Sequence, residues 1–493
     1  MSKYILAIDQ GTTGSRAFIF DAKGRVAGKA YQEFKQYYPK PGWVEHDALE
    51  IRQSVENVIR RAVKESGINA RSIAGIGITN QRETTIVWDR NTGKPLHRAI
   101  VWQDRRTADV CASPGLKRHA SYIQSSTGLR LDPYFSATKI QWLLKHVPGL
   151  KAKAKTGKVC FGTVDSWLIY QLTGRAVHAT DLTNASRTML LNLRTKIWDP
   201  RLLDIFDVPA AMLPQVFPSG HVFGRTDAVA GLPAGIPICA VMGDQQAALY
   251  GQGCFGPGMI KNTYGTGCFM VLNTGNALRI SKHGLLATLA CDAHGKPVYA
   301  LEGSVFIAGA VVQWLRDELK VIPDPFATEQ AIAGLKDTAG VYFVPAFVGL
   351  GAPYWDPNAR GIITGLTRGA NARHIIRAAI ESMAYQTKDV FDLMRRESGL
   401  KIKFLAVDGG ACRNDFLMQF QADILSIPLM RPRMVDTTVA GAAHLAGVSA
   451  GVWPVKDLDA MRGTDKIFRP SMPSQSAKEK YAGWQAAVKR ALL

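Results

Sequence analysis

A strand, a glycine–threonine turn and a second strand at residues 5–21 most constrain what this chain can fold into. The stretch reads ILAIDQGTTGSRAFIFD, with Asp9 at the end of an apolar run that is too short for a buried helix. Backbone amides in such a turn can form a concave anion site, to which Thr12 and Thr13 add hydroxyl donors. A carboxylate beside an anion site suits a magnesium–phosphate complex. The alternative is an ordinary hairpin in which Asp9 satisfies its own turn.

A second unit of the same pattern follows Gly256-Pro257-Gly258. The sequence MIKNTYGTGCFMVLN again joins two apolar runs through a turn that contains Thr266. Further on, a predicted strand at 404–407 leads through Asp408-Gly409-Gly410 into a predicted helix at 414–425, an arrangement that favours nucleotide binding. The repeat predicts an α/β protein of two domains, 1–252 and 253–493, with a cleft between them.

Polar residues also follow two further predicted strands of the first half. A predicted helix begins near Asp47 and ends at Gly67, and it is followed by a predicted strand at 73–78 that leads into NQRE. A second predicted strand, at 237–242, leads into GDQQ. Open α/β sheets bind ligands at the carboxyl ends of parallel strands. Arg82 and Glu83 can therefore share the hydroxyls of a polyol, and Asp244 can accept a proton. A solvated ion pair and a helix cap are the alternative interpretations.

The remaining pattern predicts further elements at lower detail. We expect a third strand in the aromatic-rich stretch 31–38, helix-like segments at 134–146 and 160–174, a mixed segment at 180–193 and irregular structure over 207–237. Long helices are expected at 305–319 and 374–398.

Composition narrows the functional class. The net charge of +20, from 60 basic and 40 acidic residues, mainly indicates a basic surface and only modestly favours an anionic substrate such as a nucleotide. No basic stripe interleaved with aromatic residues indicates a nucleic-acid partner. No apolar run has the length of a signal peptide or a membrane span, and seven scattered cysteines are typical of reduced thiols. A cytoplasmic protein without an integral membrane segment is therefore expected.

The motifs resemble those of the FGGY carbohydrate kinases in the actin-like ATPase superfamily, and among them the glycerol kinases. The resemblance covers nearly the whole chain and rests on DQGTT…SR (9–16), WVEHD (43–47), NQRE (80–83), YFSATKIQWLLKH (134–146), GDQQAAL (243–249), GIITGLTRGANARHIIRAAIE (361–381) and VDGG (407–410). It implies two actin-like, ribonuclease H-like α/β domains that flank a deep nucleotide and substrate cleft, a homodimer or homotetramer, and ATP-dependent phosphorylation of glycerol to sn-glycerol 3-phosphate with Mg²⁺.

The resemblance also implies a role for each matching residue. Glycerol would bind Arg82, Glu83, Tyr134, Asp244 and Gln245, with Trp102 and Phe269 on its carbon face; Asp244 would be the general base, and Asp9 and Asp244 the metal ligands; ATP or ADP would bind Thr12, Thr13, Gly14, Arg16, Thr266, Gly309, Gln313, Gly410 and Asn414.

One position and one longer stretch depart from the family pattern. Gly14 stands where glycerol kinases usually have Ser, and GRTDAVAGLPAG (224–235) lacks the pattern of the enterobacterial loop that binds fructose 1,6-bisphosphate, so we expect weak or absent inhibition by that sugar. Three other functions remain open at this point. One is a kinase for a larger polyol or ketose; another is a non-kinase actin-like ATPase, for which NQRE and GDQQ would have no use. The third is a nuclease of related fold, which would need more carboxylates near Asp9.

Overall fold

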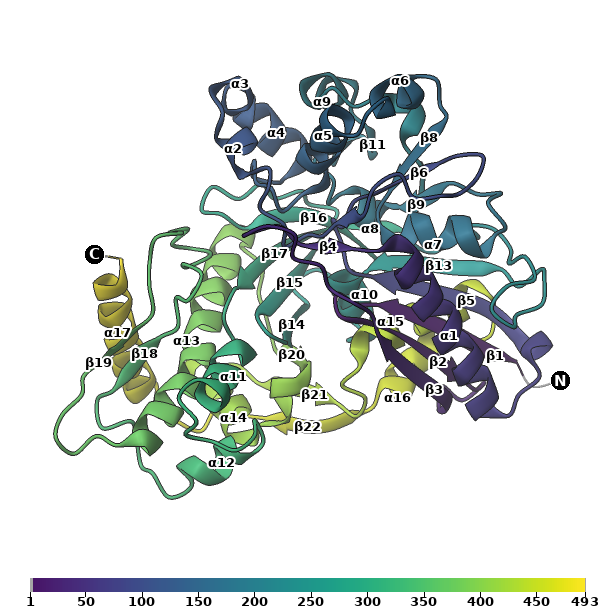
Figure 1. The fold of residues 1–493 in the computed structure, drawn as a ribbon. Coiled ribbons are helices and arrows are strands. Elements are labelled where there is room, and N and C mark those ends of the chain that lie inside the picture. Colours follow the sequence, from purple (N-terminus) through teal and green to yellow (C-terminus); the bar gives the residue numbers. More distant parts are fainter. Residues whose placement is uncertain (1–2, 493) are drawn as a thin grey trace.

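Two β-sheets form the frame of the molecule, and each contains one glycine–threonine hairpin (Figure 1). The computed structural model describes residues 3–492. The first sheet has the order β13-β5-β1-β2-β3, with β1 (Tyr4–Gln10), β2 (Gly14–Phe20), β3 (Val26–Glu33), β5 (Ile73–Asn80) and β13 (Ile238–Gly243). Since β5 is parallel to both β1 and β13, the carboxyl ends of these three strands meet at one edge of the sheet.

Side chains of the first sheet alternate between two apolar cores. Leu6 and Ile8 pack with the helices α1 (Ala48–Ser66) and α7 (Val164–Leu172), whereas Ile5 faces the opposite side. As predicted, α1 begins after Asp47, whose carboxylate accepts a hydrogen bond from the Leu49 amide at 2.8 Å, and it ends at a left-handed Gly67.

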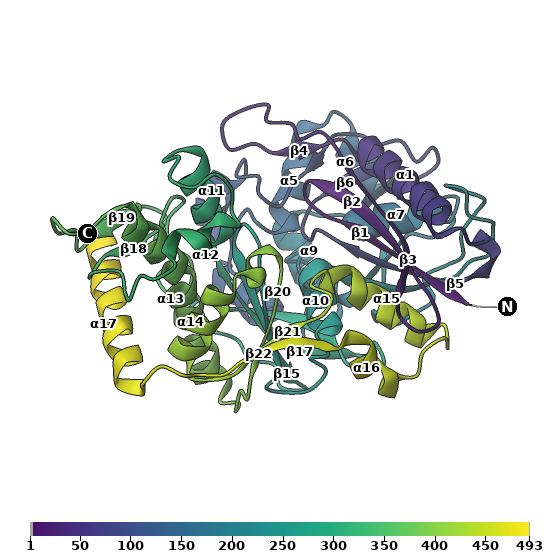
Figure 2. The same ribbon diagram turned by 90° about the horizontal axis from the view of Figure 1, so that it is seen from below.

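The helix α15 (Thr437–Ser449) comes late in the chain but covers that opposite face. Val439, Ala442 and Leu445 share one core with Ile5 and Phe18. Figures 1 and 2 show this yellow helix beside the purple strands. The division at 252 and 253 stays a prediction, but the first core is completed by residues from the second segment.

The helix α10 (Asp244–Gly251) lies between the two sheets and crosses α15 with the backbones in contact. It follows β13 directly, and its Leu249 packs with apolar residues of the second sheet. A Cβ atom on Gly441 would lie 1.9 Å from the Ala247 oxygen, and one on Gly251 would lie 2.1 Å from the Thr437 oxygen. Both positions therefore exclude a side chain.

The second sheet has seven strands and carries the larger core. Its order is β16-β17-β15-β14-β20-β21-β22, with β14 (Ile260–Tyr264), β15 (Cys268–Gly275), β16 (Leu286–Cys291), β17 (Pro297–Val305), β20 (Leu405–Asp408), β21 (Leu429–Pro432) and β22 (Thr464–Phe468). The helices that pack in this core are α11 (Gly309–Asp317), α12 (Ala327–Ile332), α13 (Ala372–Ser398), α14 (Asp415–Leu425) and α17 (Ser474–Ala491), whereas α16 (Leu458–Arg462) contributes Leu458 to the core that contains α15. A two-stranded sheet of β18 (Tyr342–Val344) and β19 (Ile362–Thr364) accompanies them.

A separate core lies within the insertion between β5 and β13. It is built around Phe135, Ile140 and Phe206 and forms the blue block at the top of Figure 1. The strands of the insertion are β6 (Ile86–Asp89), β7 (Ala99–Ile100), β8 (Val159–Gly162), β9 (Ala179–Asp181), β10 (Leu191–Asn192), β11 (Ile197–Trp198) and β12 (Gln215–Phe217), and β4 (Glu45–His46) pairs with β7. Besides α7, the helices of the insertion are α2 (Ala108–Ala112), α3 (Pro114–Lys117), α4 (Ala120–Thr127), α5 (Ser136–His146), α6 (Leu150–Lys155), α8 (Leu182–Ala185) and α9 (Pro200–Phe206).

Two predicted elements are shifted. The helix expected over 305–319 begins only at Gly309, because Val305 ends β17 as the partner of Cys268 in β15. The third strand, expected at 31–38, starts earlier as β3 because it pairs with β2 from Gly14 onward. Within residues 3–492, no helix is both long and apolar enough to cross a bilayer.

Candidate functional site

The first turn is held in place by polar residues at the carboxyl end of β5. The Gly11 amide donates to the Gly14 oxygen at 2.9 Å, which closes the turn. Gln81 Nε2 donates to Gln10 Oε1 at 3.1 Å and to the Gly11 oxygen at 3.2 Å. Asn80 exchanges two amide hydrogen bonds with Asn184. The first two residues of NQRE therefore fix the backbone on which the turn and the acceptor residues stand.

Asp9 ends β1 as a buried carboxyl group. The pKa of Asp9 is raised to about 6, chiefly by burial; the charge of Arg16 opposes this increase, and the charges of Asp244 and Asp436 add to it. Arg16, predicted to hold phosphate, is half-exposed and forms an ion pair with Asp436 at 3.0 Å. Asp436, which precedes α15, was not found by sequence reasoning.

Gly14 lies against the neighbouring strand, and this explains why no side chain is present there. A Cβ atom at this position would lie 2.8 Å from the Gln32 oxygen and 2.6 Å from Cε2 of Tyr31. Tyr31 also lies beneath the Arg16 guanidinium, 5.7 Å from ring centroid to Cζ. The Tyr31 ring occupies the space that a serine side chain at position 14 would need.

Arg82 and Asp244 meet at the carboxyl edge of the first sheet. Arg82 Nε lies 3.1 Å from Asp244 Oδ1, which also accepts the Gln245 amide at 2.7 Å. The side chains of Arg82 and Glu83 are only 2% exposed, whereas that of Asp244 is 31% exposed. Glu83 has a left-handed backbone at φ 59°, a conformation that non-glycine residues adopt mainly where the surrounding structure imposes it. Asp244 is therefore the accessible carboxylate of this group.

Two residues that the sequence did not reveal complete this charged cluster. Glu302 in β17 accepts hydrogen bonds from Arg82 Nη1 and Nη2, at 2.5 and 3.1 Å. Arg187 donates to Glu83 Oε1 at 2.6 Å and to Glu302 Oε1 at 3.0 Å. An acid within the apolar run ALEGSV and an arginine within NASRTML were the available sequence signals.

Aromatic residues connect the acceptor residues with the first turn. The rings of Trp102 and Tyr134 meet edge to face with centroids 5.6 Å apart, and the Trp102 indole donates to Thr12 Oγ1 at 3.0 Å. Phe269 is half-buried in β15, whereas Thr13 is exposed at the tip of the first turn.

The second turn is joined to the helix α11. The Gly309 amide donates to the Gly265 oxygen at 3.0 Å, and the amides of Ala308 and Ala310 donate to the Thr266 oxygen at 2.9 and 3.1 Å. A Cβ atom on Gly309 would lie 2.6 Å from the Gly265 oxygen. Thr266 and Gln313 are exposed. Gly309 therefore allows the helix to begin against the turn.

The glycine turn follows β20, which lies on the opposite side of β14 from β15. β20 pairs with β14 in parallel, and Gly410 follows it in a single helical turn. Asn414 caps α14, since its Oδ1 accepts the Leu417 amide at 2.7 Å. The capping role accounts for Asn414 structurally and leaves its predicted contact with a nucleotide as a prediction.

Lys261 is a buried cation at the base of the second hairpin. Its Nζ donates to Gln245 Oε1 at 2.5 Å and to Thr263 Oγ1 at 2.7 Å. Burial lowers the pKa of Lys261 to about 8, against the charges of Asp408, Asp244 and Glu302. Lys261 therefore fixes the side chain of Gln245, which was predicted to contact glycerol.

The donor set fits a magnesium ion that keeps water and phosphate ligands. Within residues 3–492, no three His, Cys, Asp or Glu side chains are grouped as metal ligands. Mg²⁺ is usually bound by one or two carboxylates together with substrate phosphates. Asp9 and Asp244 could provide the two carboxylates. The mutual repulsion of these two carboxylates is what a cation between them would relieve.

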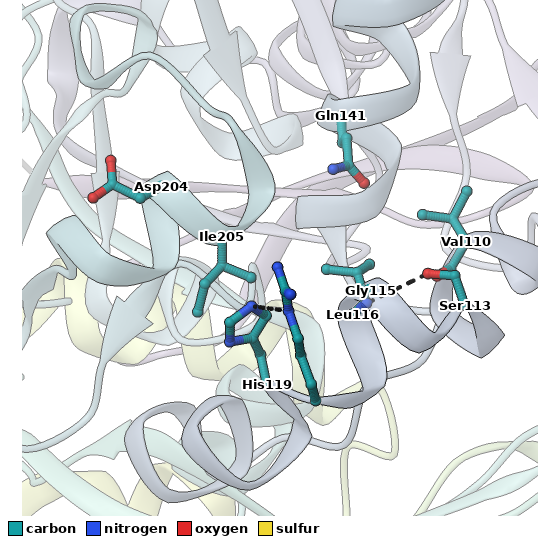
Figure 3. Close-up of a pocket in the computed structure, with 9 residues that line it drawn as sticks. Val110, Ser113, Gly115, Leu116, His119, Gln141, Asp204 and Ile205 are labelled. Atoms are coloured by element: carbon teal, nitrogen blue, oxygen red, sulfur yellow. Dashed lines mark hydrogen bonds between the residues drawn. The ribbon is translucent and has the colours of Figure 1, made fainter.

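A surface pocket lies elsewhere, in the insertion between β5 and β13. It has a volume of about 490 Å³ and is lined by residues of the insertion, including Ser113, His119, Gln141 and Asp204 (Figure 3). None of the predicted site residues is among the described residues that line it.

The loop 224–235 is closed by a hydrogen bond from Arg225 to the Gly235 oxygen at 2.9 Å. Weak or absent inhibition by fructose 1,6-bisphosphate, which was expected from this loop, stays a prediction.

Comparison with known proteins gives consistent matches over the whole chain. Residues 4–251 match the N-terminal domain, and residues 260–450 the C-terminal domain, of the FGGY family of carbohydrate kinases. The chain is 55% identical to glycerol kinase 2 of Thermotoga maritima over 492 residues, covering 99% of both chains. It is 54% identical to the glycerol kinase of Alkaliphilus metalliredigens, covering 100% of this chain and 99% of the relative.

Solved structures show the same fold. The crystal structure of Plasmodium falciparum glycerol kinase with ADP superposes with a TM-score of 0.94 at 37% identity, covering 100% of this chain and 99% of the other. The gluconate kinase of Lactobacillus acidophilus superposes with a TM-score of 0.89 at 23% identity, covering 100% of this chain and 98% of the other, and shows the shared fold alone. The predicted two-domain α/β fold of the actin-like type is therefore confirmed.

Proposed function

The chain belongs to the FGGY family of carbohydrate kinases, and we propose that it transfers the γ-phosphoryl group of ATP to a terminal hydroxyl of glycerol, giving sn-glycerol 3-phosphate. The observation that carries the proposal is the meeting of Arg82, Glu83 and Asp244 at one sheet edge, in a chain 55% identical to a glycerol kinase over its full length. Donors and acceptors at this spacing suit a small triol.

In this reaction the protein mainly positions and polarises the reactants. Asp244 accepts the proton of the attacking hydroxyl while Arg82 Nε holds its carboxylate at 3.1 Å. Glu83 accepts a hydrogen bond from a second hydroxyl, and the rings of Trp102 and Tyr134 exclude water from the carbon chain. The new bond forms between the hydroxyl oxygen and the γ-phosphorus, the bond to the bridging oxygen breaks, and ADP leaves.

The nucleotide is assigned to the two turns and the glycine turn after β20. The amides and hydroxyls of Thr12 and Thr13 lie on the first-sheet side of the phosphates, and Thr266 lies on the second-sheet side, while Gly309, Gln313, Gly410 and Asn414 line the adenosine. Asp9 and Asp244 would hold Mg²⁺ directly or through water; when bound, the ion neutralises the charge of the phosphate oxygens.

An acceptor panel tests the assignment. We expect a coupled ADP-release assay to rank glycerol above dihydroxyacetone, erythritol, xylulose and ribulose. A pentulose with a kcat/KM well above that of glycerol would overturn the choice of acceptor. ATP hydrolysis that no acceptor stimulates would instead indicate an ATPase that is not a kinase.

A further inference from the structure

Four fully buried charges form a closed chain beneath the acceptor residues, in the order Glu83, Arg187, Glu302 and Arg82. Three adjacent pairs are joined at 2.6, 3.0 and 2.5 Å, and Arg82 Nε lies 3.8 Å from Glu83 Oε1. No side chain of the four is more than 2% exposed. The two arginines and two glutamates balance, so the cluster carries no net charge.

Stability alone is a weak reason for such a cluster. Removing four charges from water is costly, and apolar side chains of similar volume often stabilise a core at least as well. What ion pairs provide is direction, because a guanidinium bound at two nitrogens by one carboxylate has a fixed plane. The cluster is therefore better explained by the geometry that it imposes on its neighbours.

We propose that Glu302 and Arg187 are positioning residues for the acceptor, an inference that rests on the proposed function. Glu302 binds both terminal nitrogens of Arg82, which leaves Nε directed at Asp244. Arg187 takes Oε1 of Glu83, and among the described residues no hydrogen bond to Glu83 Oε2 occurs. Oε2 is thereby the oxygen left for a hydroxyl of the acceptor.

The two halves of the molecule contribute to this geometry together. Arg82 follows β5 of the first sheet, whereas Glu302 lies in the middle of β17, paired with Val271 of β15 and Leu286 of β16. Arg187 Cζ also lies 5.6 Å from the ring centroid of Tyr134, so the same cation orients an aromatic residue of the acceptor site. Although burial acts against the charge, Arg187 and Arg82 lower the pKa of Glu302 to about 2, which keeps it ionised.

The variants Glu302→Gln and Arg187→Lys test the inference. Each keeps the approximate size of the side chain but loses part of the paired hydrogen bonding between guanidinium and carboxylate. In both, we expect the KM for glycerol to rise about tenfold or more while the KM for ATP changes less than about twofold. Glu302→Asp retains the charge and should restore part of the glycerol affinity. Thermal unfolding and calorimetric glycerol binding without nucleotide are measured on the same samples.

Glu381→Gln is the matched control, since it removes a buried carboxylate that pairs with Arg377 at 2.9 Å within α13. We expect this variant to lose stability without a change in the KM for glycerol. If Glu302→Gln or Arg187→Lys folds and keeps the wild-type KM for glycerol, or if the KM values for glycerol and ATP rise together as in a loosened fold, the inference is wrong. If the wild-type protein does not phosphorylate glycerol, the proposed function fails first.

Discussion

The Trp102 indole donates a hydrogen bond to Thr12 Oγ1 at 3.0 Å, across 90 residues of sequence. Trp102 also contacts Tyr134 edge to face. Trp102 was assigned to the carbon face of glycerol, and Thr12 was assigned to the phosphates of ATP. This bond gives the two substrates a direct route by which the binding of one affects the other.

A double-mutant cycle on this pair measures the coupling. Trp102→Phe keeps a ring without the N–H, and Thr12→Val keeps the shape without the hydroxyl. We expect Trp102→Phe to raise the KM values of both glycerol and ATP, and the two changes to be non-additive by about 0.5–1.5 kcal/mol in kcat/KM. Strict additivity would show that the bond carries no coupling.

Asp244→Asn tests the general base. The amide keeps the size of the side chain and cannot take the proton, so we expect kcat to fall about 100- to 10,000-fold with calorimetric ATP binding retained. Asp199→Asn is the control, because Asp199 caps α9 through the Arg201 amide at 2.9 Å and lies outside the predicted site. It should lower stability and leave kcat unchanged. If Asp244→Asn keeps the wild-type kcat, Asp244 is not the general base.

Asp9→Asn should separate activity from stability. Because burial raises the pKa of Asp9 to about 6, the ionised carboxylate at pH 7 costs the folded state about 1–3 kcal/mol. The amide removes this cost, so the free energy of unfolding at pH 7 should rise while glycerol phosphorylation falls about 100-fold or more. Urea unfolding and the coupled assay measure both. A variant that is less stable yet fully active would contradict the role of Asp9.

Gly14→Ser should not improve the binding of ATP. The added Cβ atom meets the Gln32 oxygen at 2.8 Å and the Tyr31 ring at 2.6 Å, so we expect a loss of about 1–3 kcal/mol in the free energy of unfolding and no decrease in the KM for ATP. Tyr31→Ala in the same background should recover part of the loss. An unchanged stability together with a lower KM for ATP would show that the strand shifts freely.

Asp389→Asn should change the pH dependence of stability. Asp389 accepts hydrogen bonds from Tyr481 Oη and, at 2.9 Å, from Trp484 Nε1, yet burial raises its pKa to about 6. A raised pKa means that the folded state binds the proton more tightly, so this group favours folding at low pH and the benefit is lost as the pH rises through 6.

The wild-type protein should therefore lose about 1–2 kcal/mol between pH 5 and pH 7 relative to Asp389→Asn. Urea unfolding at both pH values measures the difference. A constant difference between the two proteins would indicate that Asp389 titrates normally in the folded state.

Local patterns predicted the elements whose ends are encoded within a few residues. The helix α1 starts at Asp47 and ends at Gly67 as expected, and both hairpins appear where glycine and threonine interrupt apolar runs. The strand ends that carry Arg82 and Asp244 were found in the same way, because parallel strands place their polar continuations at one edge.

Contacts over long separations could not be predicted in this way. Glu302 lies 220 residues from Arg82, and an acid in an apolar strand gives no indication of its partner. The helix α15 is apolar on most sides, which indicates burial but not that it packs on a sheet built from the start of the chain. The predicted start of the helix over 305–319 was wrong because Val305 pairs with Cys268 and so belongs to β17.

The absence of side chains at Gly251 and Gly441 has a mechanical consequence. The backbones of α10 and α15 touch there, and atoms at such distances resist both compression and separation. The two helices therefore cannot approach one another more closely at this crossing, and neither position accepts a side chain without a shift of the backbone. Asp244, at the first turn of α10, thereby stands on a helix whose distance from α15 is set by direct backbone contact.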